Sequence, residues 1–353
     1  MAANFLHGVE TIEIEKGPRP IRTVKSAVVG LIGTAPVGDL HTPTIVLSDR
    51  QAIQFGPQLT GFSIPQALDA IFDQGAGTVI VINVLDPATH KTAVANESVT
   101  FDAANDRVKL AHPAVANLVL KSSDGATSYA AGTDFTLDAV TGTLTRLAGG
   151  AIAVGATVKA VSYDYADPTK VTAADIIGTV DAAGRRTGMK ALRDTYNLMG
   201  FFAKILIAPA WCTQNSVATE LIAMAGYLGG IALIDAPIGT TFAQALAGRG
   251  PAGSINFNTS SERAMLCYPH LKVYDMETDS ERLEPYSQRL AGVIAAKDLE
   301  RGFWWSPSNT EIKGIVGVER QFSAMINDPQ SEVNLLNEQG ITTVFSSYGS
   351  GFR

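Results

Sequence analysis

The sequence predicts an α/β core with a mostly parallel sheet and flanking helices, an inserted all-β sandwich domain and an extended N-terminal arm. Three observations support this fold class. Continuous apolar runs of strand length alternate with helical patterns on both sides of the middle of the chain, as expected for a parallel sheet covered by helices. Residues 90–167 contain short alternating strands and no clear helical pattern. The first 22 residues contain one strand-like run that Gly and Pro separate from the rest.

Length and composition fit this organisation. The 353 residues are enough for two or three domains, and a hydrophobic fraction of 46% is enough for a substantial core. We predict four segments, in the order arm, first part of the core, inserted β-sandwich domain and second part of the core. Their predicted boundaries are 1–22, 23–88, 89–168 and 169–353.

The charge pattern and the apolar stretches exclude several classes of partner. A net charge of −7 without any run of Lys or Arg argues against nucleic acid. The N-terminus lacks the features of a signal peptide, and the longest apolar stretch, Leu221 to Ile234, is too short to span a bilayer. We therefore predict no membrane insertion. Cys212 and Cys267 are far apart and flanked by apolar residues, which predicts two buried free thiols.

The arm carries a strand pattern without a local partner. Ile12 and Ile14 alternate with glutamates, and we predict a hinge where Gly17, Pro18 and Pro20 break the pattern. The backbone groups of such a strand must be satisfied by water or by another sheet. A frayed terminus or an edge strand of its own domain is as good an interpretation as a strand donated to a neighbour. The candidate strand comprises Val9, Glu10, Thr11, Ile12, Glu13, Ile14 and Glu15.

The first part of the core contains two strand patterns and two helix patterns. Ser63 and Gln66 match the S-x-x-Q capping box, with Pro65 in the first turn of the helix that follows. The glycines that follow the first strand do not open a helix as a nucleotide-binding turn does, so tight packing of the strand against a loop explains them better. The expected elements are a strand at 24–33, a helix from Ser48 to residue 54, a helix that ends at Gly75 and a strand at 78–84.

Asp-Gly, Thr-Gly and Gly-Gly turn signals separate the strands of the inserted domain. The expected strands lie within 115–122, 135–147 and 156–165. The α/β pattern then resumes, and Thr213 is a candidate cap for a helix whose buried face carries an apolar side chain on every turn. The further elements expected are helices at 189–198, 240–247 and 285–299, and strands at 203–209, 231–237 and 264–269.

Catalytic, cofactor-binding and metal-binding motifs are absent from the sequence, and we predict that the protein is not an enzyme and binds no cofactor. Asp235 and His270 follow predicted strands, at the sheet edge where sites form in parallel sheets. A turn or helix cap at Asp235 and a structural role for His270 are the better interpretations. Trp304 and Trp305 are expected to anchor a loop on the core. The acidic positions between 275 and 281 are expected to form a solvated loop.

Several motifs, taken in order, resemble the tail sheath proteins of contractile bacteriophages and related injection machines. They are HGVETIEIEKGPRPI and VKSAVVGLIGTAPVG near the start, ILIAPAW and IALIDAPIGT in the middle, and FWWSPSN, LNEQGI and GSGFR near the end. The resemblance covers most of the chain, although no single motif is specific. It implies a structural subunit that assembles as helical stacked hexameric rings around an inner tube and contracts to drive the tube through a target cell envelope.

The resemblance also implies partners and a location. The partners would be further sheath subunits, the inner tail tube protein, and the baseplate and tail terminator proteins, in a virion tail assembled in the bacterial host cytoplasm. In the family, the arm of each subunit completes a small sheet in the C-terminal domain of a neighbour. The family's G-F-R motif is normally followed by that further α/β domain, so we expect a chain that ends at Arg353 to stay monomeric or to associate weakly.

Two other classes of function stay open at this stage. An α/β enzyme with a β-rich accessory domain would have a site near Asp235 and His270, where polar groups converge at the strand ends. An adhesin-like component would place its function in the β-sandwich and would not need the arm.

Overall fold

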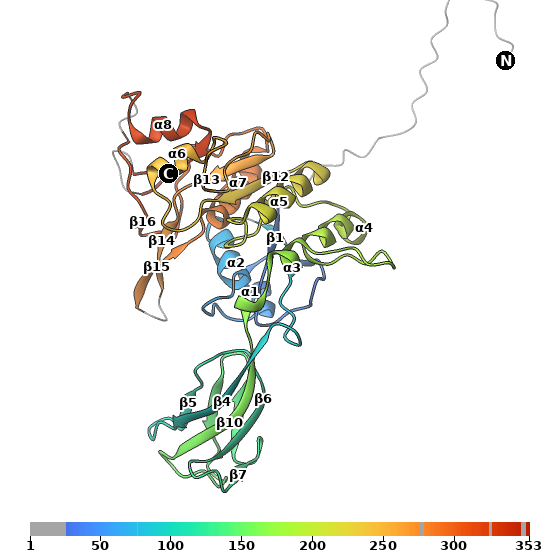
Figure 1. Ribbon diagram of the computed structural model, residues 1–353, viewed down its shortest axis with the longest axis vertical. Helices are drawn as coiled ribbons and strands as arrows, with labels where there is room; N and C mark the ends of the chain where they lie inside the picture. The colour runs from blue at the N-terminus through green and yellow to red at the C-terminus, as the bar shows by residue number, and fades with distance from the viewer. Residues whose placement is uncertain (1–25, 76, 276–278, 325–326, 347–350) are drawn as a thin grey trace, which may run out of the picture.

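The computed structural model describes residues 26–75, 77–275, 279–324, 327–346 and 351–353 (Figure 1). Within them the chain is mixed α/β with several sheets, which confirms the coarse fold class. The predicted arm strand at 9–15 and the predicted hinge at Gly17, Pro18 and Pro20 lie outside the described residues.

The centre of the molecule is a seven-stranded sheet with the order β17-β13-β12-β11-β1-β3-β2. Neighbouring strands run parallel, except that β2 pairs antiparallel with β3. The apolar runs of the sequence form the inner strands because side chains on both faces of these strands are buried. The strands are β1 (Val28–Gly33), β2 (Thr44–Val46), β3 (Thr78–Asn83), β11 (Ile205–Ile207), β12 (Ile231–Asp235), β13 (Ala264–Cys267) and β17 (Ile341–Thr342).

Helices cover both faces of this sheet. Successive side chains of a strand point to opposite faces, so each face has apolar side chains that a helix can bury. In β1, Val28 and Ile32 belong to the core under α5, whereas Val29 and Leu31 belong to the core under α2 and α7. The helices are α1 (Asp49–Ala52), α2 (Ile64–Asp73), α3 (Ala173–Ile177), α4 (Thr195–Met199), α5 (Asn215–Leu228), α6 (Phe242–Ala247), α7 (Tyr286–Arg301) and α8 (Glu332–Glu338). Short 3-10 helices lie at η1 (Ile53–Phe55), η2 (Pro168–Lys170) and η3 (Gly188–Asp194).

Two predicted helix caps are wrong. The Ser63 hydroxyl accepts a hydrogen bond from the Thr34 amide at 3.0 Å, and Gln66 Nε2 donates to the Leu59 carbonyl, so the predicted capping box does not form. Ser63 instead fixes the loop after β1 against the start of α2. The Thr213 hydroxyl donates to the Ala210 carbonyl, and α5 begins one residue after Gln214.

The segment predicted as one helix at 189–198 divides into the 3-10 helix η3 and the short helix α4. Capping boxes do form elsewhere. Thr241 and Gln244 satisfy each other's backbone groups at the start of α6, and Thr172 and Asp175 do so at the start of α3.

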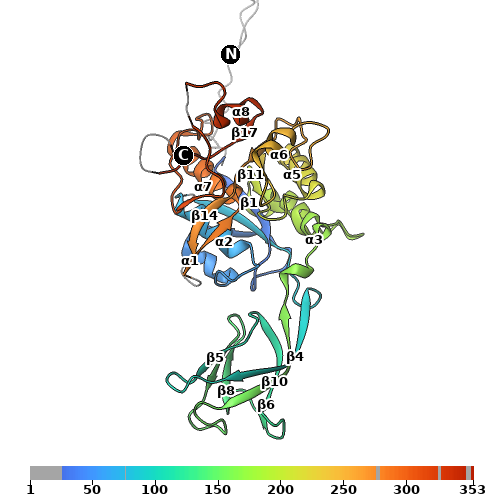
Figure 2. The ribbon, with the colours of Figure 1, turned by 60° about the vertical axis from the view of Figure 1, so that its left-hand side comes forward.

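A β-rich unit lies below the α/β part, and the strands β4 and β10 lead into and out of it (Figures 1 and 2). One of its sheets has the order β4-β10-β6-β7 and the other has the order β5-β9-β8. The unit has its own hydrophobic core, which includes Phe101, Leu144 and Tyr163. Its strands are β4 (Lys91–Thr100), β5 (Arg107–Lys109), β6 (Val115–Ser122), β7 (Ser128–Tyr129), β8 (Phe135–Asp138), β9 (Thr143–Arg146) and β10 (Thr157–Ala166).

A small antiparallel sheet with the order β15-β14-β16 lies beside the α/β core. Its strands are β14 (Leu271–Asp275), β15 (Ser280–Glu284) and β16 (Gly317–Val318). The expectation of a solvated loop is therefore wrong for Asp275 and Glu281, which lie in strands, whereas Asp279 lies in an exposed turn and residues 276–278 lie outside the described residues. The alternation of acidic with other residues marks the end of a β-hairpin, in which Asp275 pairs with Ser280.

Candidate functional site

Asp235 lies at the carboxyl end of β12 and is fully enclosed, with 1% of its surface exposed. Its Oδ1 accepts a hydrogen bond from the Ser287 amide at 2.8 Å, and its Oδ2 accepts one from the Ser287 hydroxyl at 2.5 Å. Because Ser287 is the second residue of α7, Asp235 caps this helix from a neighbouring strand. Burial raises the pKa of Asp235, although His270 and the hydrogen bonds from Ser287 and Cys212 act to lower it.

His270 lies at the strand end predicted for it and is 3% exposed. Its Nδ1 is 3.7 Å from Glu319 Oε2, and its backbone amide donates to the same oxygen at 3.4 Å. The side chains of Asp235 and His270 therefore contact structural partners, and neither lines the cavity beside α2 or the cavity beside Phe303.

Cys212 and Cys267 are buried free thiols, as predicted. Burial raises the pKa of each thiol well above its ordinary value, and the carboxyl group of Asp235 raises both further. Both thiols therefore stay protonated at neutral pH and lack the thiolate character of a nucleophile.

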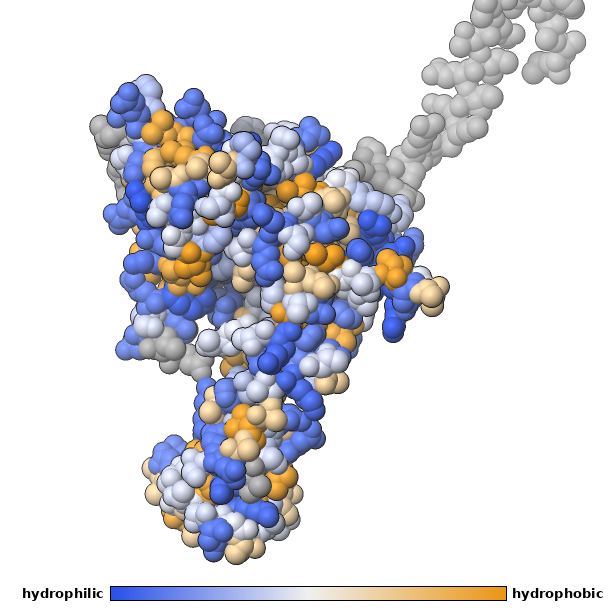
Figure 3. Space-filling view, in the orientation of Figure 1, coloured by the Kyte–Doolittle hydropathy of each residue, from blue (hydrophilic) through white to orange (hydrophobic). Residues whose placement is uncertain are grey.

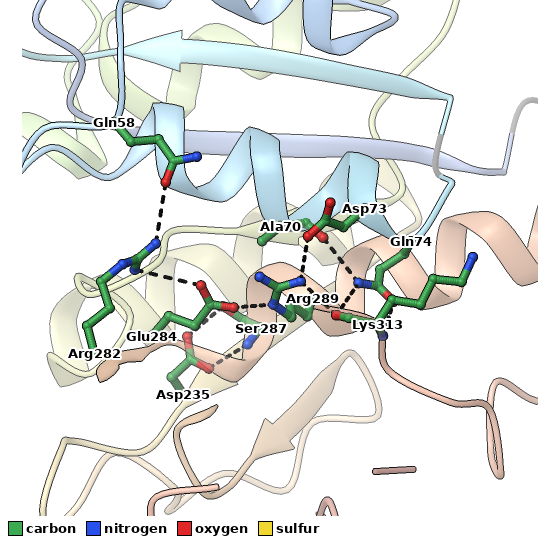
Figure 4. Close-up of polar contacts among 10 residues, drawn as sticks. All are labelled: Gln58, Ala70, Asp73, Gln74, Asp235, Arg282, Glu284, Ser287, Arg289 and Lys313. Atoms are coloured by element: carbon green, nitrogen blue, oxygen red, sulfur yellow. Dashed lines mark hydrogen bonds and ion pairs between the residues drawn. The ribbon is translucent and has the colours of Figure 1, made fainter. Parts of the chain in front are cut away.

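A buried charged cluster that we did not predict joins α2, β15 and α7 (Figure 4). The guanidinium of Arg289, whose side chain is 4% exposed, pairs with Glu284 and with Asp73 Oδ2, the latter at 2.9 Å. It also donates to the Lys313 carbonyl at 2.7 Å, and Gln74 bonds both backbone groups of Lys313 at 3.0 Å. Burial alone would lower the pKa of Arg289, but Glu284 and Asp73 outweigh it and raise this pKa.

A cavity of about 530 Å³ opens beside this cluster, between α2 and the β14–β15 hairpin. Its walls carry both signs of charge, and Arg289 and Asp73 belong both to the walls and to the buried cluster. The further charged residues of the walls are Asp69, Asp275 and Arg282. One signal in the sequence could have indicated the cluster. Helix α7 buries the polar run Ser287, Gln288 and Arg289 where an amphipathic helix would present apolar residues.

The expectation that Trp304 and Trp305 anchor a loop on the core is wrong. They are 72% and 52% exposed, and the neighbouring Phe303 is 65% exposed. The rings pack on one another and on the end of α7. The Phe303 and Trp304 rings meet edge to face at 5.3 Å, and the Arg301 guanidinium lies over Trp305 at 5.5 Å. The segment leaves the surface of the helix without reaching the core.

Within the described part of the chain, no helix combines the length and the apolar character needed to cross a bilayer. The same residues contain no group of three or more His, Cys, Asp or Glu side chains placed to hold a metal ion.

The comparison with known proteins decides the family. The family model described as the phage tail sheath protein central domain matches residues 184–353. The tail sheath protein of Burkholderia phage BcepMu is 70% identical over 353 residues, which are 100% of this chain and 74% of that protein. The chain belongs to the phage tail sheath protein family. The resemblance noted in the sequence is thereby confirmed.

More distant similarity also covers nearly all of the chain. The tail sheath protein of Escherichia phage P2 is 24% identical over 356 residues, covering 99% of this chain and 69% of that protein. A second family model, described as a protein of unknown function, matches residues 87–175 of this sheath protein. Among solved structures, the contracted helical sheath of the anti-feeding prophage aligns over 98% of this chain and 67% of the sheath chain. The sequence identity is 16% and the TM-score is 0.49. The sheath tail protein of Desulfitobacterium hafniense aligns over 97% of this chain and 73% of its own chain, with a sequence identity of 11% and a TM-score of 0.48.

Membership in this family makes the protein a structural component of a contractile tail and not an enzyme. The alternative of an enzyme with a site near Asp235 and His270 is not supported. In the sheath protein Asp235 caps α7 and His270 contacts Glu319.

Proposed function

We propose that this sheath protein assembles as helical stacked hexameric rings around an inner tube, and that contraction of this lattice drives the tube through a target cell envelope. The single observation that carries the proposal is the 70% identity with a tail sheath protein over all 353 residues. The proposal includes the tube protein and the tail terminator as partners beside the sheath subunits and the baseplate. It also includes assembly in the host cytoplasm before the sheath becomes part of the virion.

We further propose that the arm forms the link between subunits. In this proposal Val9 to Glu15 add as a strand to a sheet of a neighbouring subunit, since strand addition depends on backbone hydrogen bonds and makes few demands on side chains. Gly17, Pro18 and Pro20 act as a hinge that lets subunits rotate while the strand stays paired. A head-to-tail link of this kind propagates through a lattice instead of closing into a dimer.

The domain boundaries 1–22, 23–88, 89–168 and 169–353 also remain part of the proposal. They assign the arm to assembly, the two core parts to the lattice and the β-rich unit to the outside of the sheath. Insertions are tolerated on an outer surface because nothing in the lattice packs against it.

The test is electron microscopy of tail particles assembled from this protein with the substitution Ile12→Pro, which removes a backbone donor from the proposed strand. We expect sheaths from the full-length form of the protein and none from the same form with Ile12→Pro. The melting temperature of the isolated subunit should stay the same, because the strand has no partner there. Thr23→Pro, which lies after the hinge, is the matched control and should leave assembly intact. Normal sheaths from the Ile12→Pro protein, or a large loss of subunit stability, would contradict the role of the arm.

A further inference from the structure

The cavity between α2 and the β14–β15 hairpin carries more negative than positive charge. Asp69, Asp73 and Asp275 lie in its walls together with Arg282 and Arg289, and Glu284 lies behind these two arginines. Four carboxylates against two guanidinium groups leave a charge of −2 at the site. Asp69 is exposed, and its pKa is raised, first by partial withdrawal from water and then by the neighbouring Asp73. The site therefore favours an additional cation.

The hydrogen bonding of the cavity is incomplete on the side of Glu284. This residue is 1% exposed, and its Oε2 has no hydrogen-bond partner. The nearest cation is Arg282 Nη1 at 3.7 Å, and Figure 4 shows this oxygen directed toward Arg282 on the side of Gln58. Among the described residues, Arg282 lies 3.4 Å from Gln58 Oε1 and 3.8 Å from Asp275 Oδ2, and both contacts are long. At these distances the Arg282 guanidinium forms no strong hydrogen bond with the Glu284, Gln58 or Asp275 oxygen that it faces.

A basic projection lies on the other side of the α/β part. Residues 179–187, between α3 and η3, form a narrow turn that stands out from the body (Figures 1 and 3). The backbone of the turn is paired, since the Thr187 amide donates to Thr179 and the Asp181 amide donates to Arg185, both at 3.0 Å. Every residue from 179 to 185 is exposed, and the Arg185 side chain is 81% exposed.

Both views place the turn and the hairpin on opposite sides of the α/β part (Figures 1 and 2). A projection on one side and a hollow of complementary charge on the other are what a head-to-tail contact between identical chains requires. The turn carries Arg185 and Arg186 against Asp181, so its net charge of +1 is opposite to that of the cavity. Arg186 pairs with Asp194 at 2.5 Å, and Arg185 pairs with Asp181 at 3.1 Å, so the contact would exchange this exposed pair for the carboxylates of the cavity. Its exposed apolar residue Val180, 47% exposed, has an apolar counterpart in Leu283 of the cavity wall, which is partly exposed.

We propose that the cavity beside the β14–β15 hairpin receives the 179–187 turn of a second copy of this chain, with Arg185 pairing with Asp69 and Asp275. This inference rests on the proposed assembly of the sheath and assigns one of its subunit contacts. A guanidinium suits the site because its planar fork binds carboxylates in pairs. When the incoming Arg185 engages Asp275, Arg282 is released to hydrogen-bond the unsatisfied Oε2 of Glu284. The contact between copies thereby completes a buried network in the receiving copy.

The first experiment detects the contact directly. Arg185→Lys keeps the charge and adds an amine, so a zero-length carbodiimide reagent can join position 185 to a carboxylate that it touches. In tail particles assembled from this variant, we expect mass spectrometry to find a peptide that links position 185 to Asp69 or Asp275 of another copy. Arg107→Lys, on the exposed strand β5, is the matched control and should give no link to these carboxylates. Assembled sheaths without the link at position 185 would overturn the proposal.

The second experiment tests the charges. We expect Arg185→Glu or Asp69→Lys to lower the yield of sheathed particles roughly tenfold, as the loss of a partly desolvated charge pair does. The double variant should restore the yield because each contact then joins opposite charges. Co-production of the two single variants should restore it in part, because only contacts between unlike copies join opposite charges. Glu262→Lys, whose side chain is 89% exposed, is the control for a charge reversal elsewhere.

The outcomes separate this contact from the function on which it rests. If the full-length form of the protein, without substitutions, forms no sheath, the proposed function fails, and this contact fails with it. If the unaltered protein forms sheaths and the charge reversals leave their yield unchanged, the contact is wrong and the proposed function stands. A double variant that stays as poor as the single variants would also overturn the contact, since reversed charges would then not be meeting each other.

Discussion

Replacing Arg289 by Met tests whether the buried charged cluster holds the core together. The substitution keeps an apolar stem of similar length, so it removes charge and hydrogen bonds while leaving little cavity. Glu284, 1% exposed, then retains only Arg282 at 3.7 Å from its Oε2. Breaking a buried ion pair by removing one partner costs about 3–5 kcal/mol. The contact with Asp73 adds at most about 1 kcal/mol, because the Asp73 side chain is 43% exposed. We therefore expect the free energy of unfolding to fall by about 3–5 kcal/mol.

Urea unfolding followed by tryptophan fluorescence measures this loss of stability in the α/β part of the molecule. The three tryptophans are Trp211, Trp304 and Trp305, so the β-rich unit does not contribute to the signal. Arg301→Met in the same helix is the matched control. Arg301 is 53% exposed, and we expect its loss to change the free energy of unfolding by at most about 1 kcal/mol.

The effect of pH gives an independent check. Burial already raises the pKa of Glu284 in the intact protein, where Arg289 and Arg282 act to lower it. Without Arg289 this pKa rises further above its value in the unfolded chain. The folded variant then binds a proton at a higher pH than the unfolded chain does, so its stability decreases as the pH rises through the raised pKa. We expect the deficit of Arg289→Met to be largest at alkaline pH and to shrink as the pH falls toward the ordinary range of glutamate.

The double variant Arg289→Met with Glu284→Gln decides whether the reasoning is right. Removing both charges avoids the isolated buried carboxylate, so the double variant should be more stable than Arg289→Met alone. A loss below about 1 kcal/mol in Arg289→Met, or a double variant whose loss is the sum of the two single losses, would refute the account.

Three further predictions concern other parts of the molecule. Asp235→Ala removes the acceptor of two hydrogen bonds from Ser287 at the start of α7, and urea unfolding should show a loss of about 1–3 kcal/mol, whereas a change within error would contradict the capping role. Cys212 and Cys267 should react with iodoacetamide only after unfolding, because burial keeps both thiols protonated; rapid labelling of the native protein, seen by mass spectrometry, would disprove this. Leu144→Ala should destabilise the β-rich unit by about 2–5 kcal/mol in far-ultraviolet circular dichroism while the tryptophan transition stays in place, and a shift of both transitions would show that the two parts unfold together.

The strands of the core could be predicted from the sequence because their signal is local. A strand such as 78–83 is apolar at nearly every position, and only a place between two layers of helices suits it. Helix caps are less predictable because the same pattern can have two outcomes. Thr241 and Gln244 form a capping box, whereas Ser63 and Gln66 have the same spacing and do not. The Ser63 hydroxyl is engaged by Thr34, which is 29 positions away in the sequence.

The polar run in α7 could have indicated a buried cluster, but the partners of Arg289 could not be predicted because they meet it only in the folded chain. Asp73 and Arg289 are 216 positions apart, and neither stands in a recognisable motif. The prediction for the two exposed tryptophans was wrong for a different reason. The expectation for Trp304 and Trp305 assumed that large apolar side chains become buried within their own subunit. In a protein whose family forms sheaths, exposed aromatic residues need not be buried by their own chain.

Mutations in the charged cavity can distinguish two properties, the stability of an isolated subunit and its ability to assemble. Asp69 is exposed at the rim of the cavity, so the stability of an isolated subunit should be insensitive to the charge at this position, while assembly should be sensitive to it. Arg289 lies in its wall and in the buried cluster, so its loss should affect both. Because Arg282 lies between the two sets of residues, a bound neighbour should also stabilise the core that receives it. Stability that increases on assembly for the unaltered protein, and does not increase for Arg282→Met, would be the measurable consequence of this arrangement.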